Sequence, residues 1–412
     1  MRAAALVAPL YLVAAAIPQG GLFRGREYRD VGLYGEYAQG LLDGRLPYRD
    51  VFVEYPPGAF LVLTPPAVLA DDAYRHSFKL LMALVGLATL VVAALILIRL
   101  GAERRRLYGV LTALALAPLA LGPVSLNTYD GWPALLVAGA VAALLYDRPT
   151  LAFALLGLAA TAKLYPAALL PLFCLVVWRR GLLYPLLAFA VAVAVVVVPF
   201  ALVGAQGLWD SLEAQLERSL QVESLGGAVL LAADRLGFYD AEVVGGSTAA
   251  VSRDLAGSLP DALGVATTLL QVGAVLAVLW LARSRRDAEG IVIAAAATVT
   301  AVLVFAKFIS PQYLVWLLPL VPVAALGASV LLAAAMVLGQ LWFFHYREVF
   351  AIGDIVWLVF VRDVLLVALL VVLALRLRTK IPSSSSTVSH APLRSSSASG
   401  TAAVEGAERR SR

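Results

Sequence analysis

The chain has 412 residues and a formal net charge of +5; 61% of its residues are hydrophobic and only 14% are charged. Its mean hydropathy is +0.88. Apolar runs of membrane-spanning length recur from Ala3 to Leu375, a pattern that excludes a soluble multidomain protein and predicts an all-α polytopic membrane protein.

About twelve membrane crossings are predicted from these apolar runs, within a range of roughly 10 to 13. The expected spans are 3–18, 79–98, 107–124, 131–146, 150–161, 166–178, 182–203, 261–282, 290–306, 314–326, 328–344 and 355–375. Two of them come from Leu151–Trp178, a run that as one helix would measure roughly 42 Å, more than the roughly 30 Å of hydrocarbon in a bilayer. We therefore predict two short helices that meet at Thr161–Pro166 and carry Lys163 to the outer side.

The basic residues fall mainly on one side of this arrangement. They are Arg2, Arg99, Arg104, Arg105, Arg106, Arg148, Arg179, Arg180, Arg283, Arg285, Arg286, Arg376, Arg378 and Lys380, against Glu103, Asp147, Asp287 and Glu289. The positive-inside rule makes that side cytoplasmic. Both termini are then expected in the cytoplasm, and the segments that contain Asp30, Asp130, Lys307 and His345 are expected on the extracytoplasmic face of the cell membrane.

Residues 1–380 are expected to form one transmembrane domain with two large outer loops, 19–78 and 204–260. Leu208, Trp209, Leu212, Leu216 and Leu220 in the second loop recur at helical spacing and predict an amphipathic surface helix. The short Pro57–Ala70 segment, with two proline pairs, is expected to lie in the outer interface or to dip in and return. The Ser-rich residues 381–412 predict a disordered cytoplasmic tail.

The first outer loop is dense in carboxylates, tyrosines and arginines, from Tyr28 to Tyr34 and from Gly44 to Pro57. Ionisable groups beside hydrocarbon are costly, so a functional reason is expected, although a solvated loop is the simpler alternative. Walker, dinucleotide-binding, nucleophile-elbow and Cys/His metal motifs are absent from the sequence, which disfavours a nucleotide-driven pump or a soluble-type hydrolase. His345 ends an apolar run at the outer face, either as a substrate contact or as a polar cap.

A set of short motifs occurs in order along the chain. They are Asp30, Gly44-Arg-Leu-Pro47-Tyr48, Glu54-Tyr55-Pro56-Pro57, Tyr129-Asp130-Gly-Trp-Pro, Ala162-Lys163-Leu-Tyr165-Pro166, Arg218-Ser-Leu-Gln-Val-Glu223 and Ser310-Pro-Gln312-Tyr313. Together they resemble the GT-C superfamily of integral-membrane glycosyltransferases, in particular glycosyltransferase family 87, the polyprenyl-phosphate-mannose-dependent α-mannosyltransferases. The resemblance covers roughly residues 25 to 320 and implies a GT-C-like bundle with outer-face loops and interfacial helices.

The resemblance implies transfer of a hexose, expected to be mannose, from a polyprenyl-phosphate sugar to a lipid-linked or cell-envelope glycan on the outer face. The expected partners are this donor, the acceptor and the lipid bilayer, with no nucleic acid. No cofactor is expected, and no metal is inferred because no Asp-x-Asp pair stands beside Asp30.

Candidate roles follow from the chemistry of this transfer. A sugar hydroxyl becomes a good nucleophile when a carboxylate takes its proton, and partial desolvation tunes a carboxylate for that step. Asp30 is the candidate base, as the first-loop aspartate is across the superfamily, and a single displacement would invert the anomeric configuration. Lys163, Arg218 and Lys307 are candidates for the leaving phosphate. In the alternative, Lys163 snorkels from a helix end, Arg218 pairs with Glu223 and Lys307 is an interface anchor.

The remaining substrate-binding candidates are Glu54, Tyr48, Tyr55, Asp130, Tyr165, Glu223, Gln312 and His345. Glu54 and Asp130 either hold acceptor hydroxyls or pair with a nearby arginine. Tyr48 and Tyr55 either stack on sugar rings or lie in the aromatic belt. Two other classes of protein remain open: a secondary transporter or lipid flippase, which the broken helix at Lys163 also suits, and a non-catalytic assembly partner.

Overall fold

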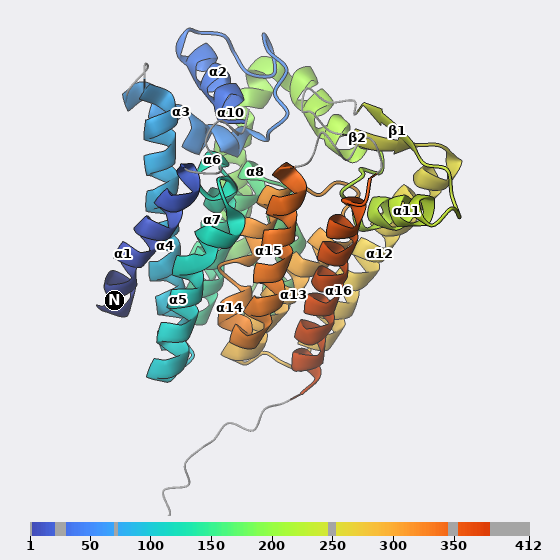
Figure 1. Ribbon diagram of the computed structural model, residues 1–412. Helices are drawn as coiled ribbons and strands as arrows, with labels where there is room; N and C mark the ends of the chain where they lie inside the picture. Colours follow the sequence, from blue (N-terminus) through green and yellow to red (C-terminus); the bar gives the residue numbers. More distant parts are fainter. Residues whose placement is uncertain (1, 21–29, 70–72, 246–252, 345–352, 380–412) are drawn as a thin grey trace, which may run out of the picture. The chain divides into compact units, whose positions relative to one another are not determined.

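Long apolar helices make up most of the structure (Figure 1). The computed structural model describes residues 2–20, 30–69, 73–245, 253–344 and 353–379. Within these residues six helical segments are long and apolar enough to cross a membrane. They are α1 with the 3-10 turn η1 (Arg2–Ala16, Ile17–Gln19), α4 (Tyr74–Arg99), α10 (Leu183–Leu216), α12 (Ser258–Ala282), η8 with α15 (Leu326–Ala328, Ser329–Phe344) and α16 (Val356–Arg378).

Shorter helices fill the spaces between the long ones. They are η3 with α3 (Pro57–Ala59, Phe60–Leu69), α5 (Arg104–Leu121), α6 (Val124–Asn127), α7 (Gly131–Leu145), α8 (Pro149–Ala162), η5 with α9 (Tyr165–Leu169, Leu170–Val177), η6 (Trp178–Arg180), α13 (Ala288–Val304) and η7 with α14 (Pro311–Leu317, Val321–Ala324). Eleven of the twelve predicted spans fall on continuous helical segments to within three residues at their ends, and the span 314–326 falls on η7 and α14, which residues 318–320 separate. The prediction of an all-α polytopic membrane protein is therefore confirmed.

The core of the bundle is built on α7 and α13, which are buried along nearly their whole length. Both helices are apolar on every side, as expected of helices surrounded by other helices. Their small side chains, mainly alanine, allow neighbouring helices to approach closely. This packing fixes the positions of the ends of the two helices. Asp130 directly precedes α7, so its position is fixed as well.

Helix α10 extends beyond the span predicted for it. Its helical turns continue to Leu216 across a break at Gly204, where φ is −151° and ψ is 49°. The predicted loop 204–260 therefore begins as helix, and the predicted amphipathic helix is the end of α10; Leu220 lies in the following loop. A Cβ atom at Gly207 would lie 1.9 Å from the Tyr48 carbonyl oxygen. Glycine is required here because the segment around Tyr48 packs directly on the α10 backbone.

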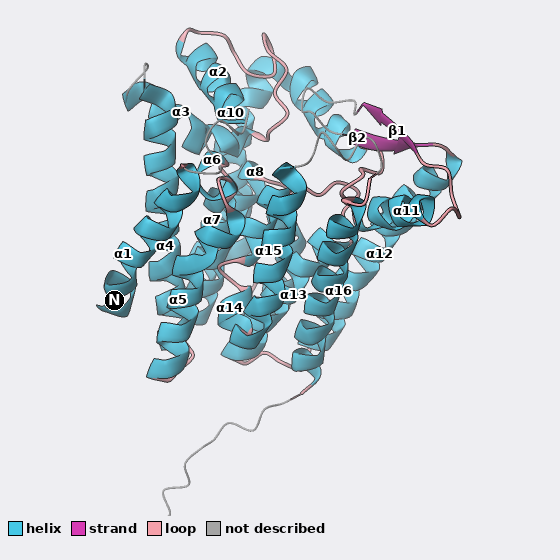
Figure 2. Cartoon of the chain, viewed as in Figure 1, coloured by secondary structure: helices cyan, strands magenta, loops and turns pink. Residues whose placement is uncertain are grey.

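One end of the bundle carries α2 (Asp30–Leu42), α11 (Leu225–Arg235) and a small hairpin (Figures 1 and 2). The strands β1 (Glu242–Gly245) and β2 (Arg253–Ala256) pair antiparallel, with Glu242 opposite Ala256. This hairpin and α11 were not predicted from the sequence. The Ser224 hydroxyl caps α11 by accepting a hydrogen bond from Gly227 N at 3.1 Å.

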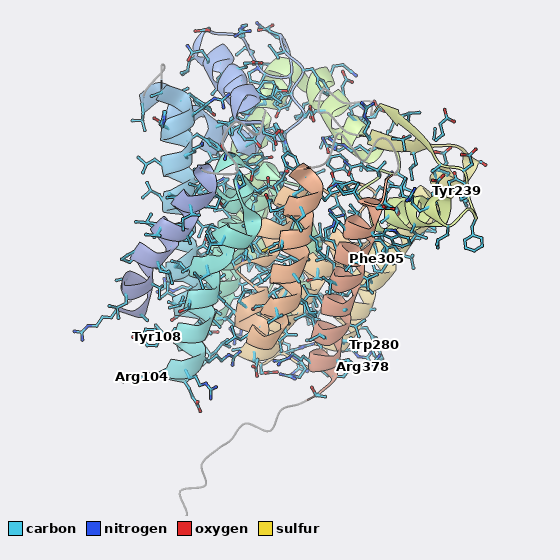
Figure 3. All side chains as sticks on the ribbon, in the orientation of Figure 1. Arg104, Tyr108, Tyr239, Trp280, Phe305 and Arg378 are labelled. Atoms are coloured by element: carbon cyan, nitrogen blue, oxygen red, sulfur yellow. The ribbon has the colours of Figure 1, made fainter. Side chains whose placement is uncertain are left out.

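The opposite end of the bundle carries basic residues that were predicted from the sequence to lie together on the cytoplasmic side. Arg99 and Arg180 both contact Asp147. Figure 3 shows Arg104 on α5 and Arg378 on α16 at this end, far from Tyr239 between α11 and β1. α1 begins and α16 ends here as well.

Candidate active site

Asp30 is the first residue of α2 and is partly buried. Gln312 Nε2 donates a hydrogen bond to Asp30 Oδ2 at 3.4 Å. The Ser310 hydroxyl donates a hydrogen bond to Gln312 Oε1 and so orients the Gln312 amide. Burial and the nearby carboxylates of Asp130 and Glu54 raise the pKa of Asp30 to about 6, while Lys163 opposes the shift. The structure therefore brings three carboxylates and a lysine from distant parts of the sequence close together.

Asp130 is fully buried at the start of α7. Its Oδ1 atom accepts a hydrogen bond from Trp316 Nε1 at 2.7 Å and lies 2.9 Å from Lys163 Nζ. Lys163 occupies the extended break between α8 and η5, so the predicted pair of short helices is present. Its ammonium group faces the rings of Tyr313 at 4.6 Å, Tyr129 at 5.1 Å and Trp316 at 5.5 Å from their centroids.

Three stacked rings form one wall beside this ion pair. Trp316 stacks on Tyr165 with a centroid distance of 4.1 Å and on Tyr313 with a distance of 4.2 Å. Tyr313 and Trp316 belong to η7, and residues three apart on a 3-10 helix lie on the same side. The short 3-10 segments η5 and η7 thus carry the three aromatic side chains of this wall.

Glu54 and Arg218 form a second buried ion pair, with Arg218 Nη2 3.6 Å from Glu54 Oε2. The Arg218 guanidinium also lies over the Phe308 ring, 4.0 Å from its centroid. Arg218 Nε is buried and has no hydrogen-bond partner among the described residues. One donor of the guanidinium is thus left unsatisfied in this ion pair.

A triangle of tyrosines joins the elements that carry the three carboxylates. Tyr34 of α2, Tyr55 of the loop between α2 and η3, and Tyr129 before α7 pack edge to face, with centroids 5.3–5.5 Å apart. Tyr129 also donates its hydroxyl proton to Ala162 O at 3.1 Å, beside the break at Lys163. A Cβ atom at Gly58 would lie 2.6 Å from the Thr161 carbonyl carbon, so the loop after Tyr55 touches the same break.

A comparison with protein-family models bears on this arrangement of acids, bases and aromatic rings. The model of glycosyltransferase family 87 matches residues 52–311, which is more than half of the chain. The chain belongs to glycosyltransferase family 87. The resemblance that the sequence motifs indicated is thereby confirmed, and the protein is a membrane glycosyltransferase.

Two further comparisons accompany the family match. No curated protein matches the chain. Among solved structures, the crystal structure of ArnT from Cupriavidus metallidurans bound to undecaprenyl phosphate is similar; it is 17% identical in sequence and has a TM-score of 0.48. The similarity covers 91% of this chain and 76% of that chain.

Other residues that the sequence put forward for this family 87 protein lie outside the cluster or have structural partners. The Lys307 ammonium donates to Leu216 O at 3.0 Å, at the end of α10. Glu223 pairs with Arg362 at 3.2 Å, so the alternative pairing of Arg218 with Glu223 is wrong. Tyr48 is buried with its ring against Phe60 and Phe200, and its hydroxyl donates to Tyr55 O at 2.5 Å. His345 lies outside the described residues.

Several residues near the site were not put forward from the sequence as catalytic or substrate-binding residues. Tyr313 and Trp316 have a spacing of three residues after Ser-Pro, which is a signal for a 3-10 turn with a shared aromatic face. Arg362 and Asp363 lie in the apolar part of α16. Ionisable side chains are costly in such a helix, so their presence in the sequence indicates a specific role. Within the described ranges, no group of three or more His, Cys, Asp or Glu side chains is placed to hold a metal ion.

Proposed function

We propose that this glycosyltransferase moves a hexose, in our proposal mannose, from a polyprenyl-phosphate sugar to a hydroxyl of a lipid-linked or cell-envelope glycan. Asp30 is the general base, and the anomeric configuration inverts. One observation carries the proposal: Asp130 and Glu54 are each paired with a cation, whereas no described cation lies within ion-pair distance of Asp30. Asp30 is the carboxylate of the cluster that remains available to take a proton.

The protonation behaviour of Asp30 suits a base. A pKa of about 6 leaves the carboxylate largely ionised at neutral pH and makes it a stronger proton acceptor than an ordinary aspartate. In the proposed step, the acceptor oxygen forms a bond to the anomeric carbon while its proton passes to the Asp30 carboxylate. The bond from the anomeric carbon to the phosphate oxygen breaks, and its electron pair leaves with polyprenyl phosphate.

Arg218 is our candidate for binding that phosphate. Its guanidinium is largely buried, is held on one side by Glu54 and Phe308, and keeps an unpartnered Nε–H. Arginine donors match phosphate oxygens in geometry, and a charge-assisted bond is strengthened in a partly dry site. Lys163 is already bound to Asp130 and enclosed by rings, so we assign it mainly an electrostatic effect on Asp30 and Asp130.

The proposed donor class rests on the side of the membrane that we propose for the site. Arg104 and Arg378 lie at the far end of the bundle (Figure 3), so the positive-inside rule favours an extracytoplasmic site with both termini in the cytoplasm. Nucleotide sugars are not supplied on that face, whereas polyprenyl-phosphate sugars are carried in the membrane itself. The identity of the sugar as mannose rests on the sequence resemblance alone.

The test is the Asp30→Asn variant, purified and reconstituted with polyprenyl-phosphate mannose and membrane glycolipid acceptors. Loss of general-base help is expected to slow turnover by about 10²–10⁴-fold, while donor and acceptor binding change far less. Glu36→Gln is the matched control, because Glu36 is an exposed carboxylate on the same helix. NMR of the product is expected to give an α-glycoside from a β-linked donor. Full activity of Asp30→Asn, or retained anomeric configuration, would overturn the mechanism.

A further inference from the structure

Arg362 is a fully buried arginine on α16, six residues after the helix begins at Val356. Its Nε donates to Asp363 Oδ1 at 2.8 Å and its Nη1 to Glu223 Oε2 at 3.2 Å. Its Nη2 donates to the main-chain oxygen of Glu223. A guanidinium buried in a membrane-spanning helix is costly, and it persists only where several partners compensate the lost hydration.

Glu223 belongs to the loop 217–224, which joins α10 to α11. Gln221 fixes the middle of this loop: its main-chain N donates to Lys307 O at 2.9 Å, and its side-chain oxygen accepts from Ile309 N at 3.0 Å. Leu220 and Val222 pack in a small apolar cluster that also contains residues of α16. The loop is thus tied to the 307–309 segment in its middle and to α16 at its end.

Arg218 lies near the start of the same loop and points to Glu54. Glu54 Oε2 lies 3.6 Å from Arg218 Nη2, beyond ordinary hydrogen-bond distance. The guanidinium position therefore depends on the path of the loop as well as on its own ion pair. The charged attachment of that loop to α16 is the contact between Arg362 and Glu223, which consists of two hydrogen bonds, one to the Glu223 carboxylate and one to its main-chain oxygen.

We propose that Arg362 is a positioning residue for substrate binding: by clamping Glu223 it fixes the loop 217–224 and so holds the Arg218 guanidinium where the donor phosphate binds. The inference rests on the proposed role of Arg218. It also gives α16 a role in donor binding, although this helix lies outside the segment matched by the family model.

The test uses Arg362→Lys, which keeps the charge but loses the fork that grips Glu223 at two atoms. The KM for the polyprenyl-phosphate donor is expected to rise by about tenfold or more, with kcat within about threefold and an unchanged KM for the acceptor. Glu223→Gln is the second variant, because it keeps the size of the side chain and weakens the same contact. Arg235→Lys is the control: it alters an exposed ion pair with Asp354 that also joins α11 to the segment before α16, and it should leave the donor KM unchanged.

A double-variant cycle separates positioning from general support of the fold. Once Arg218 is replaced by Gln, adding Arg362→Lys is expected to cause no further rise in the donor KM, because the residue it positions is gone. Independent, multiplying effects of the two substitutions would overturn the inference, as would an unchanged donor KM in both Arg362→Lys and Glu223→Gln. An unchanged donor KM in Arg218→Gln alone would instead refute the proposed phosphate ligand.

Discussion

The Lys163 ammonium lies 2.9 Å from the Asp130 carboxylate and joins the break after α8 to the start of α7. Asp130 is fully buried, and the Lys163 side chain is only 12% exposed. Trp316 donates to the same carboxylate oxygen. This pair therefore neutralises one of the three clustered carboxylates inside the protein, whereas no described cation lies within ion-pair distance of Asp30.

We expect each single break of this pair to destabilise the protein strongly. Lys163→Ala and Asp130→Asn each leave one buried charge without its partner, at a cost of about 3–5 kcal/mol. The double variant Asp130→Asn with Lys163→Gln carries neither charge, so it is expected to lose less stability than the two single variants added together. Reversible unfolding in mixed micelles measures the three free energies.

The exposed pair of Arg49 with Asp50 provides the control for this cycle. Its members are solvated, so Arg49→Gln is expected to change the free energy of unfolding little. Strictly additive losses at Lys163 and Asp130 would contradict the coupling that their short contact implies.

The pH dependence of turnover should report the ionisation of Asp30. Because the base must be ionised, kcat/KM is expected to fall about tenfold per pH unit below the pKa of Asp30, which is about 6. The residual activity of Asp30→Asn should lack this acid limb. A limb near the ordinary value of an aspartate, 3.8, would mean that the buried environment does not act on the catalytic group.

Two neighbouring substitutions should move that limb in opposite directions. Lys163→Gln removes a cation that lowers the pKa of Asp30, so the limb is expected at higher pH. Asp130→Asn removes an anion that raises this pKa, so the limb is expected at lower pH. Rate profiles of the two folded variants check the signs, and shifts in the same direction would exclude Asp30 as the titrating group.

Removing the Asp30 charge should also stabilise the protein above pH 6. The pKa of this acid is raised on folding, so stability falls as the pH rises from about 4 to about 6, and the full cost persists at higher pH. One pKa unit corresponds to about 1.4 kcal/mol, which sets an upper limit near 3 kcal/mol for Asp30→Asn at neutral pH. Unfolding at pH 4 should show little difference from the wild type. If the difference in unfolding free energy between Asp30→Asn and the wild type were the same at pH 4 and at pH 8, the raised pKa of Asp30 would be contradicted.

The sequence predicted the helical spans and the break at Lys163 because these depend on local hydrophobicity, length and proline. Ion-pair partners depend on the path of the chain. Arg218 has Glu223 five residues away, yet the structure pairs it with Glu54 from the first outer loop. The edge-to-face triangle of Tyr34, Tyr55 and Tyr129 joins three separate segments, and no local pattern specifies such contacts.

The sidedness of the site can be tested with single cysteines in a Cys174→Ala background. Asp240 and Glu103 are both exposed, the first in the 204–260 region and the second before α5. We expect Asp240→Cys to react with an impermeant maleimide in intact cells, and Glu103→Cys to react only after permeabilisation, because the charge distribution places the α5 end in the cytoplasm. A cysteine in the Ser-rich tail should behave as Glu103→Cys does. The reversed pattern would place Asp30 and Arg218 on the cytoplasmic face, where nucleotide sugars are available, and would remove the argument for a lipid-linked donor.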